Sequence, residues 1–132
     1  MTEEPSLDLI RIREALEASW DEKTSYLGIS QDGNLAYGQC YPTAWLVQQL
    51  FPSTEIVEGK VWTGKTIETH FWNVLLFNDQ LFHIDLTWQQ FPFGSLVREF
   101  KIRDRRELND GPQTVERCEL LKQRVLDYLR RR

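Results

Sequence analysis

Residues 38–51, Gly38-Gln39-Cys40-Tyr41-Pro42-Thr43-Ala44-Trp45-Leu46-Val47-Gln48-Gln49-Leu50-Phe51, predict the central helix of the fold. The apolar residues of this stretch recur at steps of three and four, which is the spacing of a buried helix face. Pro42 suits the first turn of a helix, because the N–H group that proline lacks would have no partner there. We therefore expect a helix that begins at or next to Cys40 and is ended by Pro52 and Ser53.

The position of Cys40 at this helix start indicates a chemical role. The positive end of the helix dipole and the unpaired backbone N–H groups there favour the thiolate, which is the reactive form of cysteine. The same N–H groups could hold a negatively charged oxygen. The alternative is a small buried apolar residue, as free cysteines often are. Residues further along the chain decide between the two interpretations.

The composition is that of an ordinary globular domain and excludes several classes of protein. The chain has 132 residues, of which 41% are hydrophobic and 27% charged, enough for one domain with a modest core. A net charge of −4 argues against a nucleic-acid partner, which would require a basic face. The acidic N-terminus shows no signal-peptide pattern, and no stretch is long enough to span a membrane. We expect a cytoplasmic protein with Cys40 and Cys118 reduced, and Cys118 in the core of the last helix.

The remaining patterns predict a single α+β domain over residues 1–132, with residues 1–6 disordered. Ser6 should cap a helix from about Leu7 to Ser19, and its buried stripe should contain Leu7, Ile10, Leu16 and Trp20. A polar loop with a turn at Asp32-Gly33 should then lead to the Cys40 helix. The further expected elements are strands at 55–62, 68–77, 80–87 and 95–102 and a helix at 114–131.

The two central strands should form a hairpin that fixes the geometry of a site. Asn78-Asp79 suits a two-residue turn with positive φ, so Phe77 should pair with Gln80. In this register His70 and Asp85 are diagonal neighbours on one face, whereas a three-residue loop would put them on opposite faces. The face with His70 also carries Trp72, His83 and Thr87. The opposite face, which we expect to be the core face, carries Phe71, Leu75, Phe77, Phe82, Ile84 and Leu86.

Cys40, His70 and Asp85 have the chemistry of a nucleophile, a base and an orienting acid. The imidazole would take the thiol proton, and the carboxylate would fix the tautomer of the ring. Taken alone, His70 is more often a structural strand histidine, and Asp85 could simply cap the turn that follows it. Their joint order and spacing favour a site. His83 is interpreted as a neighbour, and Trp72 as a packing residue that could also line a substrate site.

Three motifs resemble the transglutaminase-like branch of the papain-like superfamily: Cys40 in GQCYPTAW, His70 in HFWN and Asp85 in HIDLT. That branch has a cysteine at a helix start, then His-x-Trp on a strand, then Asp-x-Thr about fifteen residues later, and fifteen residues separate His70 from Asp85 here. The YunG-like family of small bacterial proteins is a closer match over most of residues 14–100. The residues that carry this closer match are Ser19-Trp20, Gly38-Gln39-Cys40, Thr43-Ala44, Val47-Gln48, His70-Phe71-Trp72-Asn73, Asp85-Leu86-Thr87 and Gln90-Phe91.

The resemblance implies a papain-like core, in which N-terminal helices pack on an antiparallel sheet and a C-terminal helix closes the domain. It also implies that Cys40, His70 and Asp85 form a catalytic triad. Papain-like proteases have an oxyanion-hole glutamine six residues before the cysteine, and this chain has Asn34 there. Gln39, directly before the cysteine, is the other candidate for that role.

Three hypotheses for the function follow. In the first, Cys40 attacks an amide or thioester carbonyl and forms a thioacyl intermediate; water then makes the protein an amidase, peptidase or deamidase, and an amine makes it a transglutaminase. The substrate would be a peptide or small amide, with no cofactor and no metal. In the second, the chain is a binding or regulatory module that keeps the fold without turnover. In the third, Cys40, His70, His83 and Asp85 bind zinc. The first hypothesis explains the helix start and the hairpin best.

Overall fold

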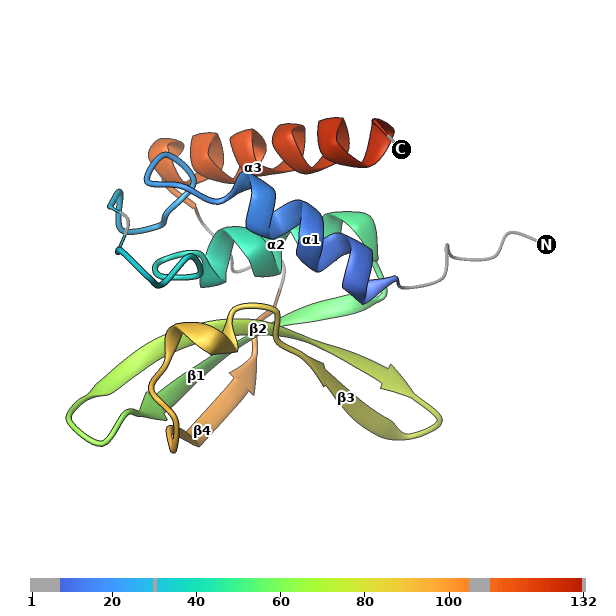
Figure 1. Ribbon diagram of the computed structural model, residues 1–132. Coiled ribbons are helices and arrows are strands. Elements are labelled where there is room, and N and C mark those ends of the chain that lie inside the picture. Colours follow the sequence, from blue (N-terminus) through green and yellow to red (C-terminus); the bar gives the residue numbers. More distant parts are fainter. Residues whose placement is uncertain (1–7, 30, 105–109, 132) are drawn as a thin grey trace.

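The computed structural model describes residues 8–29, 31–104 and 110–131 and places three helices on one side of a four-stranded antiparallel sheet (Figure 1). The strand order is β3-β2-β1-β4. The elements are α1 (Leu9–Ser19), α2 (Cys40–Leu50), β1 (Thr54–Trp62), β2 (Ile67–Phe77), β3 (Gln80–Ile84), the 3-10 helix η1 (Trp88–Gln90), β4 (Leu96–Ile102) and α3 (Pro112–Arg130). The predicted α+β class is confirmed. None of the helices in these residues is both long and apolar enough to cross a bilayer.

Helix α2 begins at Cys40, as the sequence predicted, and lies between the other two helices and the sheet (Figure 1). Hydrogen bonds to both layers hold its first turns. The Trp20 indole N–H donates to the Thr43 hydroxyl at 3.1 Å, and the Asn73 amide of β2 donates to the Ala44 carbonyl at 2.9 Å. The main core lies under the helices and contains Ile12, Ala15, Leu16, Trp20, Ala36, Leu46, Val47, Phe51, Leu121 and Val125.

Helix α1 differs from the prediction in its cap and in its buried face. The carboxylate of Asp8 caps the helix by accepting from the Arg11 backbone N–H at 3.0 Å. The predicted cap Ser6 lies outside the described residues, as does Leu7. The buried residues are Ile12, Ala15, Leu16 and Ser19. Ile10 is 78% exposed, so its placement in the core was wrong. It precedes Ile12 by two positions, which is about 200° around the helix, and it therefore faces away from the core.

The predicted hairpin register is confirmed over the part that forms. Phe77 pairs with Gln80, and Asn78 and Asp79 have positive φ angles of 52° and 62°. Strand β3 ends at Ile84, however, three residues before the predicted end at 87. The chain turns there because an Asp85 carboxylate oxygen accepts from the backbone N–H of residue 87 at 3.2 Å. The predicted ladder pairs beyond Ile84 therefore do not form.

The prediction of the core face was partly wrong. Phe71 does pack against the cluster of Tyr41, Ala44, Ile56 and Cys118 on the helical side. Phe77 and Phe82, near the hairpin turn, are 59% and 47% exposed, because α2 does not extend over that end of the sheet. On the opposite face, His70 and Trp72 are buried and Val57, Trp72 and Val74 form a small core cluster.

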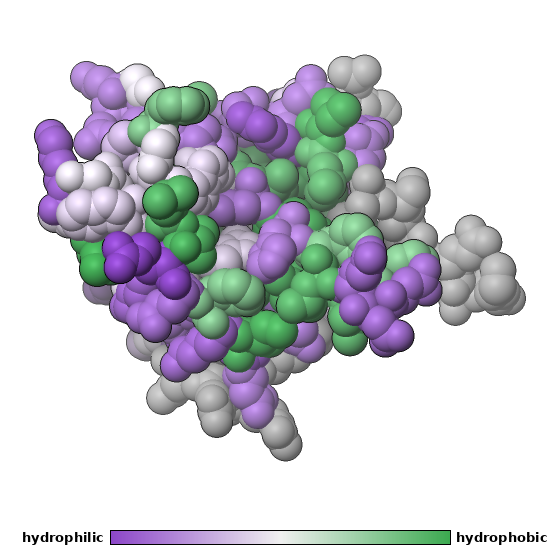
Figure 2. Space-filling view, turned by 90° about the horizontal axis from the view of Figure 1, so that it is seen from below, coloured by the Kyte–Doolittle hydropathy of each residue, from purple (hydrophilic) through white to green (hydrophobic). Residues whose placement is uncertain are grey.

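The outer part of this second face carries exposed apolar side chains. Figure 2, which views the molecule from below the sheet, shows apolar groups gathered among polar ones. The exposed apolar residues that the register places on this face include Leu76, Leu81, Val97, Phe100 and Ile102.

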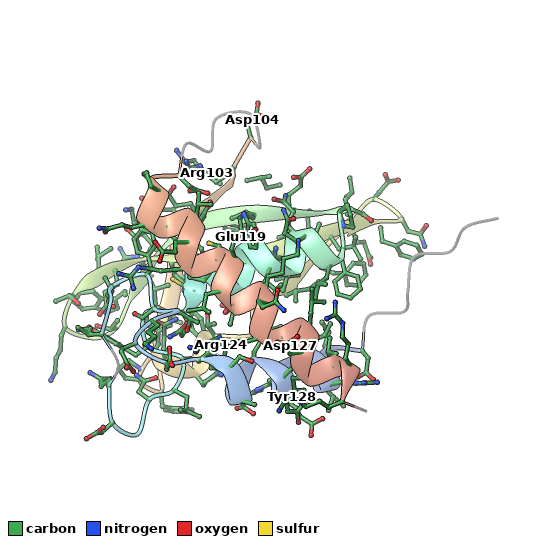
Figure 3. All side chains as sticks on the ribbon, turned by 90° about the horizontal axis from the view of Figure 1, so that it is seen from above. Arg103, Asp104, Glu119, Arg124, Asp127 and Tyr128 are labelled. Carbon is green, nitrogen blue, oxygen red and sulfur yellow. The ribbon has the colours of Figure 1, made fainter. Side chains whose placement is uncertain are left out.

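Helix α3 closes the domain across α1 and α2 and fixes the loop that leads to Cys40 (Figure 3). The Arg124 guanidinium donates to the Ser19 carbonyl at 2.9 Å and pairs with the Asp21 carboxylate at 2.8 Å. Arg117 donates to the Ser25 carbonyl at 2.9 Å. Cys118 is fully buried and free, as predicted, and burial raises the pKa of its thiol to about 12.

We predict that Gly59→Ala destabilises the fold by about 1–3 kcal/mol, the usual cost of overpacking. A Cβ atom at Gly59 would lie 2.4 Å from the Trp72 ring and 3.0 Å from the Glu99 carbonyl oxygen. Gly111→Ala is the matched control, because a Cβ atom there would meet nothing within 4 Å. Urea unfolding of both variants measures the difference, and equal midpoints would contradict the packing described above.

Candidate active site

The candidate site lies where α2 begins and where β2 loses the partner strand on one side. Strand β3 pairs with β2 only over residues 73–77, so the segment of β2 that contains His70 has no β3 partner. The chain between β3 and β4 passes beside this segment (Figure 1), and Asp85, Trp88 and Phe91 all contact the His70 ring. The early end of β3 thus allows a loop, rather than a strand, to supply the partners of His70.

Asp85 holds one nitrogen of the His70 ring. His70 is completely buried, and its Nε2 lies 2.7 Å from Asp85 Oδ2. The other carboxylate oxygen, Oδ1, accepts from the Thr87 backbone N–H at 3.2 Å and from the Thr87 hydroxyl at 3.4 Å. Asp85 therefore caps the turn after β3 and orients His70 at the same time. The two interpretations of this residue are compatible.

The other nitrogen of the His70 ring, Nδ1, is the one that could exchange a proton with Cys40. Nδ1 of His70 is buried and forms no well-aligned hydrogen bond with the described residues. The Cys40 side chain lies near the same ring, since Cys40 is among the groups that raise the pKa of His70. Cys40 is thus close enough to change the pKa of the ring, but no aligned hydrogen bond joins it to Nδ1. Loose geometry of this kind is common in sites without substrate.

The pKa of His70 results from opposing effects. Burial lowers it, but the hydrogen bond with Asp85, the charge of Asp85 and the neighbouring Cys40 together raise it to about 9. The ring is therefore mostly charged at neutral pH.

Three aromatic side chains enclose His70. Trp72 stacks on the ring, with centroids 5.4 Å apart and 29° between the planes. Phe91 and Trp88 stand edge-on at 4.7 Å and 6.0 Å. Cys40, by contrast, is only partly buried. The His70 ring is therefore shielded from water, whereas Cys40 keeps some exposure.

Gln39 and Asn34, the candidates for the oxyanion site, are both engaged in structural hydrogen bonds. The buried Gln39 amide accepts from the Thr24 hydroxyl and donates to the Asp21 carbonyl, both at 2.9 Å. The Asn34 amide donates to the Gln31 side chain at 2.9 Å and to the Gln90 carbonyl at 3.0 Å. Both amide protons of Asn34 are therefore used. The start of α2 offers backbone N–H groups that have no partner within the helix.

The other two predicted site residues, Trp72 and His83, are hydrogen-bonded to each other. The Trp72 indole N–H donates to Nδ1 of His83 at 3.0 Å, so His83 is a neighbour of the site, as interpreted from the sequence. Among the residues that the structure describes, no group of three or more His, Cys, Asp or Glu side chains could hold a metal ion. The zinc hypothesis required four such side chains to converge, and the described residues do not bring them together.

The sequence analysis missed two features of the site. Gly59 pairs with His70 across the sheet and lets the Trp72 ring lie against β1. A glycine inside a strand signals a close approach of this kind and could have indicated it. The edge-on contacts of Trp88 and Phe91 follow from the path of a loop, which no periodicity in the sequence reveals.

One surface hollow lies apart from Cys40 and His70. The hollow lined by Glu58, Lys60, Glu99, Phe100 and neighbouring residues has a volume of about 270 Å³ and lies over β1 and β4. Neither Cys40 nor His70 lines it. The candidate site is identified by the side chains of Cys40, His70 and Asp85.

Comparison with known proteins gives one match. The family model described as YunG protein matches residues 8–130 and so spans all three residues of the candidate triad. Neither the curated proteins nor the solved structures gave a match.

We predict that the His70 ring titrates in NMR spectra with a pKa of about 9, and that Asp85→Asn lowers this value by removing a negative charge. In Cys40→Ala/Asp85→Asn only burial remains, so the pKa should fall below the ordinary histidine value of 6.5. A variant of His83 assigns the second of the two histidine signals.

The same shift predicts a change of stability with pH. Because the folded pKa of His70 is raised, its contribution to the unfolding free energy is complete below pH 6.5 and is lost as the pH rises through about 9. Urea unfolding across this range should show a smaller decline for Asp85→Asn than for the wild type. A wild-type His70 pKa at or below 6.5 would contradict both expectations.

Proposed function

The chain belongs to the YunG family, and we propose that it acts as a cysteine-dependent acyl-transfer enzyme. Cys40 is the nucleophile, His70 the general base and acid, and Asp85 the orienting residue. One observation carries the proposal: a completely buried histidine has one nitrogen on a carboxylate at 2.7 Å and interacts with a cysteine at a helix start. The second ring nitrogen, Nδ1, is buried without a hydrogen-bond partner among the described residues, which supports an exchange of a proton with Cys40.

The first half of the reaction starts from the thiolate of Cys40 and the charged ring of His70. The sulfur attacks the carbonyl carbon of an amide or thioester, and the electron pair of the C=O bond moves to oxygen. Backbone N–H groups at the start of α2 hold this oxyanion. When the intermediate collapses, the bond to the leaving group breaks, and the leaving amine or thiolate takes the proton of His70. The acyl group is then bound to the sulfur as a thioester.

The second half returns the enzyme to its starting state. Water or an amine gives a proton to the now neutral His70 and attacks the thioester carbonyl. The carbon–sulfur bond breaks, and Cys40 leaves as the thiolate beside the recharged ring. Water gives a carboxylic acid, and an amine gives a new amide. Asp85 keeps the ring oriented and stabilises its charge throughout.

The finer expectations from the sequence belong to the same proposal. A helix-start cysteine that meets a histidine on an antiparallel sheet supports a papain-like core of the transglutaminase-like type. The exposed side of Cys40 suits a peptide or small amide that approaches from solvent. Both cysteines are free, which supports a reducing compartment such as the cytoplasm.

We predict that Cys40 reacts rapidly with iodoacetamide at neutral pH and that His70→Ala slows this reaction. An activated ester of a small carboxylic acid should also leave an acyl group on Cys40, visible by intact mass. Loss of general base catalysis should slow turnover of the ester by about 10²–10⁴-fold. Asp85→Asn should have a smaller effect, because Asp85 acts through the ring.

Cys118→Ala is the control, since Cys118 is buried and should contribute no labelling. His70→Gln serves as a second variant if His70→Ala does not fold. Labelling of folded Cys40 at the rate of a free cysteine, with no dependence on His70, would contradict the proposal. The chain would then be better described as a binding or regulatory module.

A further inference from the structure

We infer that His83 is a positioning residue of the candidate site and acts on His70 through the indole ring of Trp72. The inference rests on the proposed function, because it concerns the orientation of the base that serves Cys40. It assigns a role to the second histidine, which the mechanism above does not use.

The hydrogen bond between Trp72 and His83 defines the state of both side chains. The indole N–H can only donate, so Nδ1 of His83, 3.0 Å away, must accept. His83 is therefore neutral in this contact and carries its proton on Nε2. The bond fixes the polar edge of the indole to β3, the neighbouring strand.

The rest of the indole is held by the other strands. Gly59 of β1 leaves no room between ring and backbone, as a Cβ atom there would lie 2.4 Å from the ring. Phe100 of β4 lies 5.9 Å from Trp72 and stands perpendicular to His83 at 5.3 Å. Trp72 is only 4% exposed. Its position is thus set by packing on two sides and by one directional bond, which His83 supplies.

Trp72 in turn controls the plane of the His70 ring. Asp85 binds His70 at a single atom, Nε2, and one hydrogen bond does not determine how the ring is rotated about it. The stacking of His70 on Trp72, at 29°, adds a constraint on the plane of the ring, beside the edge-on contacts of Phe91 and Trp88. The indole face also attracts a charged ring. A shift of the indole should therefore disturb the Cys40–His70 contact.

Three variants isolate this effect. His83→Leu removes the acceptor and keeps an apolar side chain against Phe100. His83→Asn offers a side-chain oxygen near the position of Nδ1. Trp72→Phe keeps an aromatic ring on His70 but removes the donor. Phe82→Leu, at an exposed position of the same strand, is the matched control and should leave labelling unchanged.

The experiment measures iodoacetamide labelling of Cys40 against pH in the full chain, with urea unfolding in parallel. His83→Leu should slow labelling at neutral pH by about three- to tenfold, the effect expected from the loss of one hydrogen bond. His83→Asn should restore the rate to within about twofold of the wild type. In the Trp72→Phe background, His83→Leu should have no further effect, because the bond is already lost.

Equal slowing by His83→Leu and His83→Asn would overturn the inference, as would a full additional effect in the Trp72→Phe background. A change in stability with unchanged labelling would also overturn it. The His70 titration in a Cys40→Ala background separates this inference from the proposed function, since it does not require a reactive cysteine. There, His83→Leu should change the His70 pKa and His83→Asn should not; an unchanged pKa in both would reject the role of His83 even if Cys40 proves reactive.

Discussion

The hydrogen bond between His70 and Asp85 is the contact on which the rest of the site depends. A charged imidazole with no exposed surface is costly, and the carboxylate at 2.7 Å offsets that cost. To bring Asp85 there, β3 has to end at Ile84 and the chain has to turn through Thr87. The same turn leads into η1, whose flanking aromatic residues close over the ring. The contact between His70 and Asp85 is thus linked to the early end of β3, to the path of the loop that follows it and to the burial of His70.

Cys40 is held from the helical layer by a chain of polar contacts. Arg124 of α3 pairs with Asp21, and the Asp21 carbonyl accepts from the Gln39 amide. Gln39 directly precedes Cys40, so the closing helix sets the start of α2 through the loop between α1 and α2. Gly38, with φ of 74°, allows the tight approach of this loop, since a Cβ atom there would lie 2.2 Å from the Ser25 hydroxyl oxygen. Gln39 therefore holds the backbone at the start of α2, next to Cys40.

The parts that could be predicted from the sequence are those that local chemistry determines. Asn78-Asp79 specified the turn and with it the hairpin register, and Pro42 specified where the Cys40 helix begins. The parts that were missed depend on contacts between distant residues. The phase of α1, which exposes Ile10, is set by its packing on α3. The engagement of Gln39 and the stacking of Trp72 on His70 likewise follow only once the layers are assembled.

The central claim is that Cys40 and His70 form an ion pair, in which Cys40 is a thiolate and the proton lies on the His70 ring. Ultraviolet absorbance of the thiolate tests it most directly, as the difference between the wild type and Cys40→Ser across pH. Cys118, with a pKa of about 12, does not contribute near neutral pH. We expect thiolate absorbance at neutral pH that is lost in His70→Ala. A wild-type protein without thiolate at neutral pH, or one whose thiolate is unaffected by His70→Ala, would contradict the account.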